Sequence, residues 1–591
     1  MARERRGHGP VSRAMTGGLD ILRSSSGLYR RYLERRYGKP RSSSIVAGGD
    51  VSMGVVRGAI LQGLGIPARE MRTKPLIAVA NSWCELNPGH VHLGELARSV
   101  KNGILSAGGI PFEFNVPAPC DGLGNGNEGM RFLLPQRDVI ADMIELYVRS
   151  QWLDGLVMLS SCDKINPGMM MAAARLDLPA VFVPGGPNMM NIRFTRKGEG
   201  IDHREFRGLR DKVQTTTAAT CGACELLTTA NTMQCLIEAM GMALPGAAAS
   251  PAFSSVKKVQ AWESGERVVE LVKEGLKPSE VVTADAIENA VMVALALGGS
   301  TNCVLHLVAI ARELGIELDI NVFNRYNRVV PTICSIAPSG PHGVTDLYAA
   351  GGVPAVMKRL AADLHGDCLS VSGDTIGKIA KRARVLDESV IRDKKKPYRD
   401  EGAIAVLSGN LAPEGCVVKS SAVPDSLLHF EGPALVFDGE VEALLAISRG
   451  QVRPGTALIV RYEGPRGGPG MPELLSITTT IELLALKRVV LITDARFSGA
   501  SAGLAVGHVS PEAYAGGPIA LVRDGDTVAI DVAARSITLR VEDAELERRK
   551  VGWRPRERQL AAGYLRRYKA QVGSASKGAV LGSGSSEREA G

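Results

Sequence analysis

Residues 153–168 read LDGLVMLSSCDKINPG, an apolar run followed directly by polar residues and a helix signal. The run 153–159 predicts a buried strand. Asn166 and Pro167 predict the start of a helix, with Asn166 as its cap and Pro167 in its first turn. A strand, a turn and a helix in this order are the building unit of an α/β fold.

Three reactive side chains lie in the turn of this unit. Cys162, Asp163 and Lys164 fall at the carboxyl end of the expected strand, where open α/β sheets bind ligands. Thiolates favour iron–sulfur clusters and carboxylates favour magnesium. The turn therefore indicates a site with two different metal centres. The alternative is a buried cysteine next to a solvated charge pair.

The same alternation extends on both sides of this unit. Strands are expected at 75–82 and 179–186, and a helix at 137–153. These segments predict an N-terminal α/β/α domain with a mostly parallel sheet. After a charged stretch at 380–400, short strands and Gly-rich turns predict a β-barrel-like domain with flanking helices. A basic helix is expected at 546–568.

The expected domain organisation has four parts. A basic, flexible extension (1–44) is followed by the α/β domain (45–390), which carries the cluster ligands and part of the magnesium site. The barrel-like domain (391–575) carries the catalytic serine and one magnesium ligand, and a flexible tail (576–591) ends the chain.

Composition narrows the class of protein. The chain has 591 residues, 45% of them hydrophobic, and a net charge of +8. Residues 1–41 carry eleven basic and three acidic residues, so the body is neutral and does not indicate nucleic-acid binding. No apolar run is long enough to span a membrane. Ten scattered cysteines do not form a disulfide scaffold, and we expect a cytoplasmic protein.

Seven ordered motifs carry a family resemblance. They are PGHVHL (88–93), CDGLGNGNEGM (120–130), SCDKINPGM (161–169), GACELLTTANTM (222–233), GGSTN (298–302), YEGPRGGPGMPE (462–473) and TDARFSGASAGLAVGHVSPEA (493–513). Together they resemble the dihydroxy-acid and phosphogluconate dehydratase family of iron–sulfur enzymes. The resemblance covers roughly residues 45–580 and implies a hydro-lyase.

The resemblance implies an iron–sulfur cluster, [2Fe–2S] or [4Fe–4S], held by Cys162 and Cys224. The family has four residues between its ligand and the TANTM-type helix start, which matches Cys224 and makes Cys221 a bystander. Members with three cysteine ligands carry cysteine where this chain has Gly89. The third ligand stays open between two candidates, Cys84 and Cys120, and an open iron position would also suit a Lewis acid that binds substrate.

The resemblance also implies a Mg²⁺ site. Its expected ligands are Asp121, Asp163, Glu473 and Lys164, the last as a carbamylated lysine. Oxygen ligands of this kind suit Mg²⁺. Glu463 is the competing carboxylate, and the spacing of Glu473 to the serine motif favours Glu473.

Ser498, in RFSG, matches the family's proton-abstracting serine. The implied reaction is an elimination that converts 2,3-dihydroxy-3-methyl carboxylic acids to 2-keto acids and water in valine and isoleucine biosynthesis, with both metals as Lewis acids. A sugar-acid or phosphogluconate dehydratase is the alternative substrate class. A redox iron–sulfur protein without turnover is the alternative of another class. The resemblance implies a small-molecule substrate and a homodimer or dimer of dimers.

Overall fold

The computed structural model describes residues 51–189, 220–499, 501 and 503–582. Its N-terminal part contains a four-stranded parallel sheet in the order β2-β1-β3-β4. The strands are β1 (Leu76–Asn81), β2 (Ile110–Asn115), β3 (Gly155–Ser160) and β4 (Ala180–Pro184). The strands expected at 75–82, 153–159 and 179–186 are therefore confirmed.

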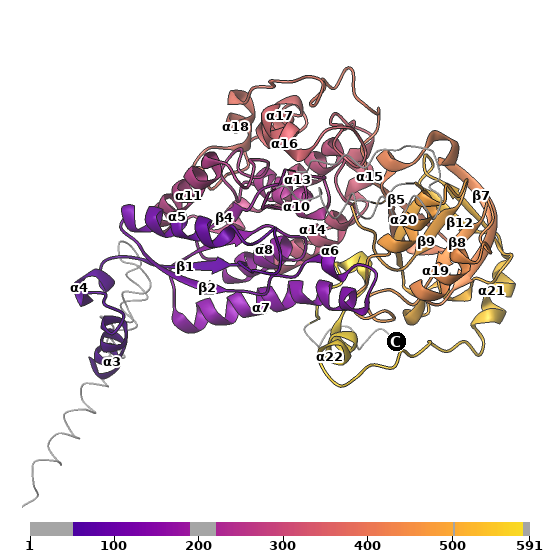
Figure 1. Ribbon diagram of the computed structural model, residues 1–591, viewed down its shortest axis with the longest axis horizontal. Helices are drawn as coiled ribbons and strands as arrows, with labels where there is room; N and C mark the ends of the chain where they lie inside the picture. The colour runs from indigo at the N-terminus through magenta and orange to yellow at the C-terminus, as the bar shows by residue number, and fades with distance from the viewer. Residues whose placement is uncertain (1–50, 190–219, 500, 502, 583–591) are drawn as a thin grey trace, which may run out of the picture.

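Helices cover both faces of this sheet. In Figure 1, α5 (Leu93–Ser106) and α11 (Ser255–Glu274) lie above the sheet and α7 (Leu133–Gln151) runs below it. The helix α5 packs against α11, and α7 packs against α8 (Ile165–Leu176). Because both faces are covered, β1 and β3 are continuous apolar strands that are buried along their whole length.

Two glycines set the close approach of α5 and α11. A Cβ atom on Gly103 would lie 2.0 Å from the backbone oxygen of Trp262, and one on Gly265 would lie 2.1 Å from that of Val100. No side chain fits at either position, so glycine is required where these helices cross.

Eleven further α-helices are described before the barrel, and those from α6 onward lie in the same body as the sheet. They are α3 (Val51–Gln62), α4 (Ala68–Met71), α6 (Asp121–Gly124), α10 (Thr229–Ala239), α12 (Pro278–Val281), α13 (Ala284–Leu297), α14 (Asn302–Glu313), α15 (Val322–Asn327), α16 (Val344–Ala349), α17 (Gly352–Arg359) and α18 (Ile376–Arg382). Figure 1 shows α3 and α4 projecting from the body at its N-terminal end.

The C-terminal part is a closed eight-stranded barrel in the order β10-β6-β5-β12-β11-β7-β8-β9, seen on the right of Figure 1. Its strands are β5 (Ala405–Gly409), β6 (Ala412–Val418), β7 (His429–Phe437), β8 (Ala457–Val460), β9 (Val490–Thr493), β10 (Ala505–Ser510), β11 (Thr527–Asp531) and β12 (Ser536–Leu539). The pairing is mixed. The pairs β7–β8, β8–β9 and β9–β10 are parallel, whereas β6 pairs antiparallel with both β5 and β10. The expected α/β and barrel-like architecture is confirmed. The helices α19 (Glu440–Ser448) and α20 (Leu475–Leu483) flank the barrel.

The basic helix expected at 546–568 is wrong as one element. The structure has α21 (Asp543–Lys550) and α22 (Tyr564–Gln571) with an irregular segment between them. Gly552 and Gly563 both adopt positive φ angles, and Pro555 lies between them, so a continuous helix is interrupted there.

The predicted cap of α8 is also wrong. The helix begins at Ile165 and the residue at its cap position is Lys164. The side chain of Asn166 is instead engaged elsewhere, since its Oδ1 accepts from Ser160 and its Nδ2 donates to the backbone oxygen of Ala230. Pro167 does lie in the first turn, as predicted.

The chain ends are described only in part. The predicted extension 1–44 lies outside the described residues, as do residues 583–591 of the predicted tail. The tail does not start at 576, because Ala579 and Val580 are buried and Arg137 donates to the backbone oxygen of Ala579 at 2.8 Å. Among the described residues, no helix is both long and apolar enough to cross a bilayer.

Candidate active site

The candidate residues converge where the sheet edge meets the barrel. The loops after β1, β2 and β3 carry Cys84, Cys120 with Asp121, and Cys162 to Lys164. Parallel strands end at the same edge, so these loops become neighbours. The barrel contributes Glu473, which pairs as an isolated β-bridge with Arg496 in the loop after β9.

Three buried carboxylates form one group at this edge. One carboxylate oxygen each of Asp121, Asp163 and Glu473 lies within 4.8 Å of the other two. The amine of the fully buried Lys164 lies among them, with Nζ 2.5 Å from Asp121 Oδ2, 2.8 Å from Asp163 Oδ2 and 3.7 Å from Glu473 Oε1. The structure therefore brings together all four residues that the sequence predicts for a magnesium site.

The electrostatics of this group fit a bound cation. Burial raises the pKa of Asp121, and it raises the pKa of Glu473 to about 7. The Oδ1 atom of Asp121 is buried, and no described residue donates a hydrogen bond to it. Buried carboxylates that are costly to ionise and not fully paired are stabilised by a metal ion, and oxygen donors suit Mg²⁺. A carbamate on Lys164 would add further oxygen donors in place of a competing amine.

Neighbouring side chains fix the carboxylates in place. Asn302 Nδ2 and Arg496 Nη1 donate to Glu473 Oε1 at 2.6 Å and 2.9 Å. His306 Nε2 lies 3.3 Å from Asp163 Oδ1, and burial lowers the pKa of His306 well below its usual value. Sequence reasoning assigned no role to Asn302 or Arg496. Their positions within GGSTN and TDARF were the only available signal.

We expect Asp121→Asn to raise the Mg²⁺ concentration needed for half-maximal activity by at least about tenfold, since even outer-shell changes weaken metal binding by about 10–100-fold. The cause is the loss of one anionic oxygen from the group. The measurement is activity against added Mg²⁺ after chelator treatment. An unchanged Mg²⁺ response would remove Asp121 from the metal site.

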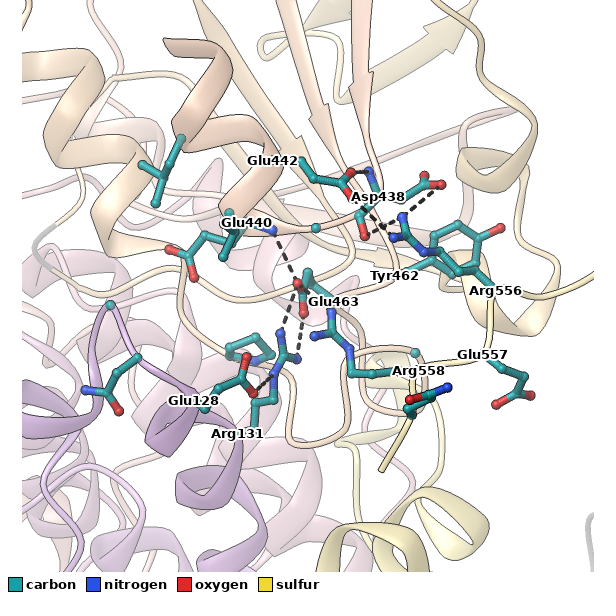
Figure 2. Close-up of a pocket in the computed structure, with 18 residues that line it drawn as sticks. Glu128, Arg131, Asp438, Glu440, Glu442, Tyr462, Glu463, Arg556, Glu557 and Arg558 are labelled. Atoms are coloured by element: carbon teal, nitrogen blue, oxygen red, sulfur yellow. Dashed lines mark hydrogen bonds and ion pairs between the residues drawn. The ribbon is translucent and has the colours of Figure 1, made fainter. Parts of the chain in front are cut away.

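Glu463, the competing carboxylate, lies in a different place. It accepts from Arg131 Nη1 at 2.7 Å and from Arg558 Nη2 at 3.0 Å. Figure 2 shows this arrangement in the wall of a cavity of about 560 Å³, which Pro472 also lines. Because two arginines neutralise Glu463, its local role is to hold the N-terminal and C-terminal segments together. The larger cavity thus borders the carboxylate group but does not contain it.

Three thiols gather beside the carboxylate group. The Cys162 thiol donates to the Cys120 sulfur, and this bond lowers the pKa of Cys120 to about 7. The same bond, followed by burial and by the charges of Cys120 and Cys224, raises the pKa of Cys162. Loss of hydration around the sulfur raises the pKa of Cys224, although the residue as a whole is exposed. A soft metal cluster would replace these competing protons, because thiolates are its preferred ligands.

The two other nearby cysteines stand apart from these thiols. Cys84 Sγ accepts from the backbone amide of Leu86 at 3.3 Å. Burial raises the pKa of Cys221, and the charged groups that act on it are Glu95 and Lys258. Within the described part of the chain, neither cysteine has a side-chain hydrogen bond to Cys120, Cys162 or Cys224, whereas Cys120 and Cys162 interact with each other. The geometry therefore favours Cys120 over Cys84 as a third thiolate.

Ser498 lies in the loop that follows β9, four residues after the buried Asp494. It is half-buried, and its backbone oxygen accepts from the amide of Ser501 at 3.0 Å. A small cavity is lined by Thr301, Lys419, Phe497, Ser498, Ser501, Gly503 and Ala505. The volume of this cavity is about 10 Å³, roughly the space of one water molecule. A serine hydroxyl acts as a base only where neighbouring groups stabilise its anion.

Comparison with known proteins gives a consistent match over both parts of the chain. The family model described as dihydroxy-acid/6-phosphogluconate dehydratase N-terminal matches residues 74–379, and its C-terminal counterpart matches residues 389–579. A dihydroxy-acid dehydratase from Ignicoccus hospitalis is 48% identical over 541 residues, covering 88% of this chain and 97% of that protein. Dihydroxy-acid dehydratases from Thermodesulfovibrio yellowstonii and Methanospirillum hungatei are 46% and 45% identical, covering 88% and 90% of this chain and 97% and 99% of those proteins.

Proposed function

Because this chain belongs to the dihydroxy-acid/6-phosphogluconate dehydratase family and is thereby a hydro-lyase, we propose that it converts 2,3-dihydroxy-3-methyl carboxylic acids to 2-keto acids and water. This reaction would serve valine and isoleucine biosynthesis. The observation that carries the proposal is the buried group of Asp121, Asp163 and Glu473 around Lys164, directly beside three thiols.

The proposed cofactor ligands follow from this group. Asp121, Asp163, Glu473 and carbamylated Lys164 would hold Mg²⁺, and Cys162 and Cys224 would hold an iron–sulfur cluster with Cys120 as the third ligand. When bound, the two metal centres supply Lewis-acid stabilisation of charge on the substrate and on the leaving hydroxyl. We also infer a homodimer or a dimer of dimers from the family.

The protein's own residues have separate tasks in this proposal. Ser498 removes the C2 proton of the substrate at the wall of its cavity. Arg496 and Asn302 fix Glu473, and neutral His306 orients Asp163. Holding these groups in place before substrate binds reduces the reorganisation needed for the reaction.

The substrate class is supported by the apolar surroundings of the site. A buried cluster of Leu134, Leu305, Met471, Tyr568, Val572, Ala575 and Ala579 lies beside it. Met471 is two residues before Glu473, and Leu305 is adjacent to His306. The C-terminal segment 563–580, whose sequence resembles the ending of the branched-chain biosynthesis members, supplies four members of this cluster. A branched aliphatic substrate suits such surroundings better than a polyol does.

We expect 2,3-dihydroxy-3-methylbutanoate and its methylpentanoate homologue to give higher kcat/KM values than any pentonate or hexonate. Each hydroxyl left unpaired against an apolar wall costs about 1–3 kcal/mol. The measurement is 2-keto-acid formation by one anaerobic preparation on both substrate classes. The sequence CDG at 120–122 also resembles phosphogluconate dehydratase, so a sugar acid is the competing substrate. A sugar acid that wins by about tenfold or more would refute the proposed substrate.

A further inference from the structure

A buried lysine from the barrel shares the cavity of Ser498. Lys419 follows β6 directly, and only 8% of its surface is exposed. It lines the small cavity together with Ser498, and its Nζ donates to the backbone oxygen of Gly499 at 3.3 Å. Three chain segments far apart in sequence therefore meet at this cavity: the end of β6, the loop after β9, and Thr301 before α14.

The surroundings of Lys419 do not favour its charged form. In the described ranges, no carboxylate lies within ion-pairing distance of its amine. The group that acts on it electrostatically is Cys303 of α14, whose own thiol is buried and has a raised pKa. Loss of hydration lowers the pKa of Lys419 to about 8, and Cys303 opposes this only weakly. At pH 7 about a tenth of this lysine is thus a free amine that can accept a proton, and about half of it is at pH 8.

The proposed function leaves one requirement unmet, because a serine hydroxyl is a poor base in water. A serine that abstracts a proton needs a neighbour that accepts the hydroxyl proton and then stabilises the anion. The carboxylate group around Lys164 cannot do this by itself, since its charges are negative. A side chain that is neutral before the transfer and positive after it meets both needs.

We propose that Lys419 is the positioning residue that takes the hydroxyl proton of Ser498, a role that rests on the proposed dehydratase function. The Oγ–H bond of Ser498 breaks and an N–H bond forms on Lys419, which leaves an alkoxide beside an ammonium. The alkoxide takes the C2 proton of the substrate, and the C2–H electron pair forms the double bond as the C3–O bond breaks. The hydroxide that leaves receives the proton held by Lys419, so the products are enol and water, and both side chains return to their starting states.

This role predicts the direction of the pH dependence. Below the pKa of Lys419, the amine already carries a proton and cannot accept another. Activity therefore falls as the pH drops below about 8 and levels off above that value. Removal of the Lys419 amine should abolish the fall in activity below about pH 8, because the proposed proton acceptor of Ser498 is then missing.

The test compares Lys419→Met, Lys419→Arg and the exposed control Lys487→Met, all purified anaerobically. We expect Lys419→Met to lower kcat by at least about tenfold, with KM within about twofold, and to lose the limb near pH 8. Arginine should not restore the rate, since it keeps a positive charge but does not accept a proton at neutral pH. The kinetic isotope effect with C2-deuterated substrate should rise in both variants, and Lys487→Met should match the unmodified enzyme.

Several results would overturn this role. Lys419→Arg with a normal rate and profile would reduce Lys419 to a fixed charge, and Lys419→Met with an unchanged limb would exclude it. If the variants do not fold, the pH profile of the unmodified enzyme still tests the role. Constant activity between pH 6.5 and 9.5 would exclude Lys419 as the proton acceptor, because this range extends roughly 1.5 units on either side of its expected pKa. An enzyme that dehydrates no dihydroxy acid refutes the proposed function itself and with it this role, whereas turnover with a flat profile refutes only Lys419.

Discussion

Cys162→Ser is expected to yield a protein without the visible absorption of an iron–sulfur cluster and without dehydratase activity. Cys162 interacts with both other thiols of the group, since its thiol hydrogen-bonds to the Cys120 sulfur and its pKa is affected by the charge of Cys224. A serine hydroxyl is a hard, weakly acidic donor and does not replace a thiolate in such a cluster. The measurements are the absorption spectrum and the iron content of anaerobically purified protein.

Two further cysteine variants test which cysteine of the segment 221–224 is the cluster ligand. Cys224→Ser should lose the cluster as Cys162→Ser does, while Cys221→Ser, three residues away, should retain it. The reason is that Cys221 interacts with Glu95 and Lys258 and not with the other thiols. Loss of the cluster in Cys221→Ser and its retention in Cys224→Ser would show that the assigned register is wrong.

The third ligand can be decided by the same spectra. Cys120→Ser should weaken or alter the cluster absorption, because the Cys120 sulfur accepts a hydrogen bond from Cys162 and the pKa of Cys120 is already lowered to about 7. Cys84→Ser should leave the spectrum unchanged, since its sulfur accepts only from the local Leu86 amide among the described residues. The opposite pair of results would assign the third position to Cys84.

Much of the fold could be predicted because its signals are local. β1 and β3 are buried over their full length, and their short apolar runs, bounded by turn residues, identify them as strands. The break between α21 and α22 also has a local signal, since Gly552, Pro555 and Gly563 stand in the sequence. The basic residues around them have a composition typical of a helix, which is why composition predicts one continuous helix where the structure has two.

The site was predictable only where a motif carried it. Glu473 and Glu463 are ten residues apart in the same motif, and no periodicity tells them apart. The fold separates them, because Glu473 turns toward Asp121 while Glu463 is neutralised by Arg131. Lys419 gave no signal at all, since its role depends on a contact with a loop 80 residues later in the chain.

Ser498→Ala is expected to lower kcat by about 10²–10⁴-fold, the usual range for loss of a general base, and to leave the cluster spectrum intact. Ser498 lines the cavity with Lys419 but is not among the thiol or carboxylate groups that would hold metals. The loss should therefore appear in the chemical step and not in cofactor content. The measurements are kcat, iron content and the absorption spectrum of one preparation.

The control for this change is Ser408→Ala, because Ser408 is exposed on β5 and lies outside the cavity of Ser498. It should keep full activity, which separates the loss of one particular hydroxyl from a general effect of the substitution. Near-normal turnover by Ser498→Ala with an intact cluster would exclude Ser498 as the acceptor of the C2 proton. The abstraction would then fall to another group at the cavity, and Lys419, with its pKa near 8 and its amine at the same wall, is the residue that could act on the substrate directly.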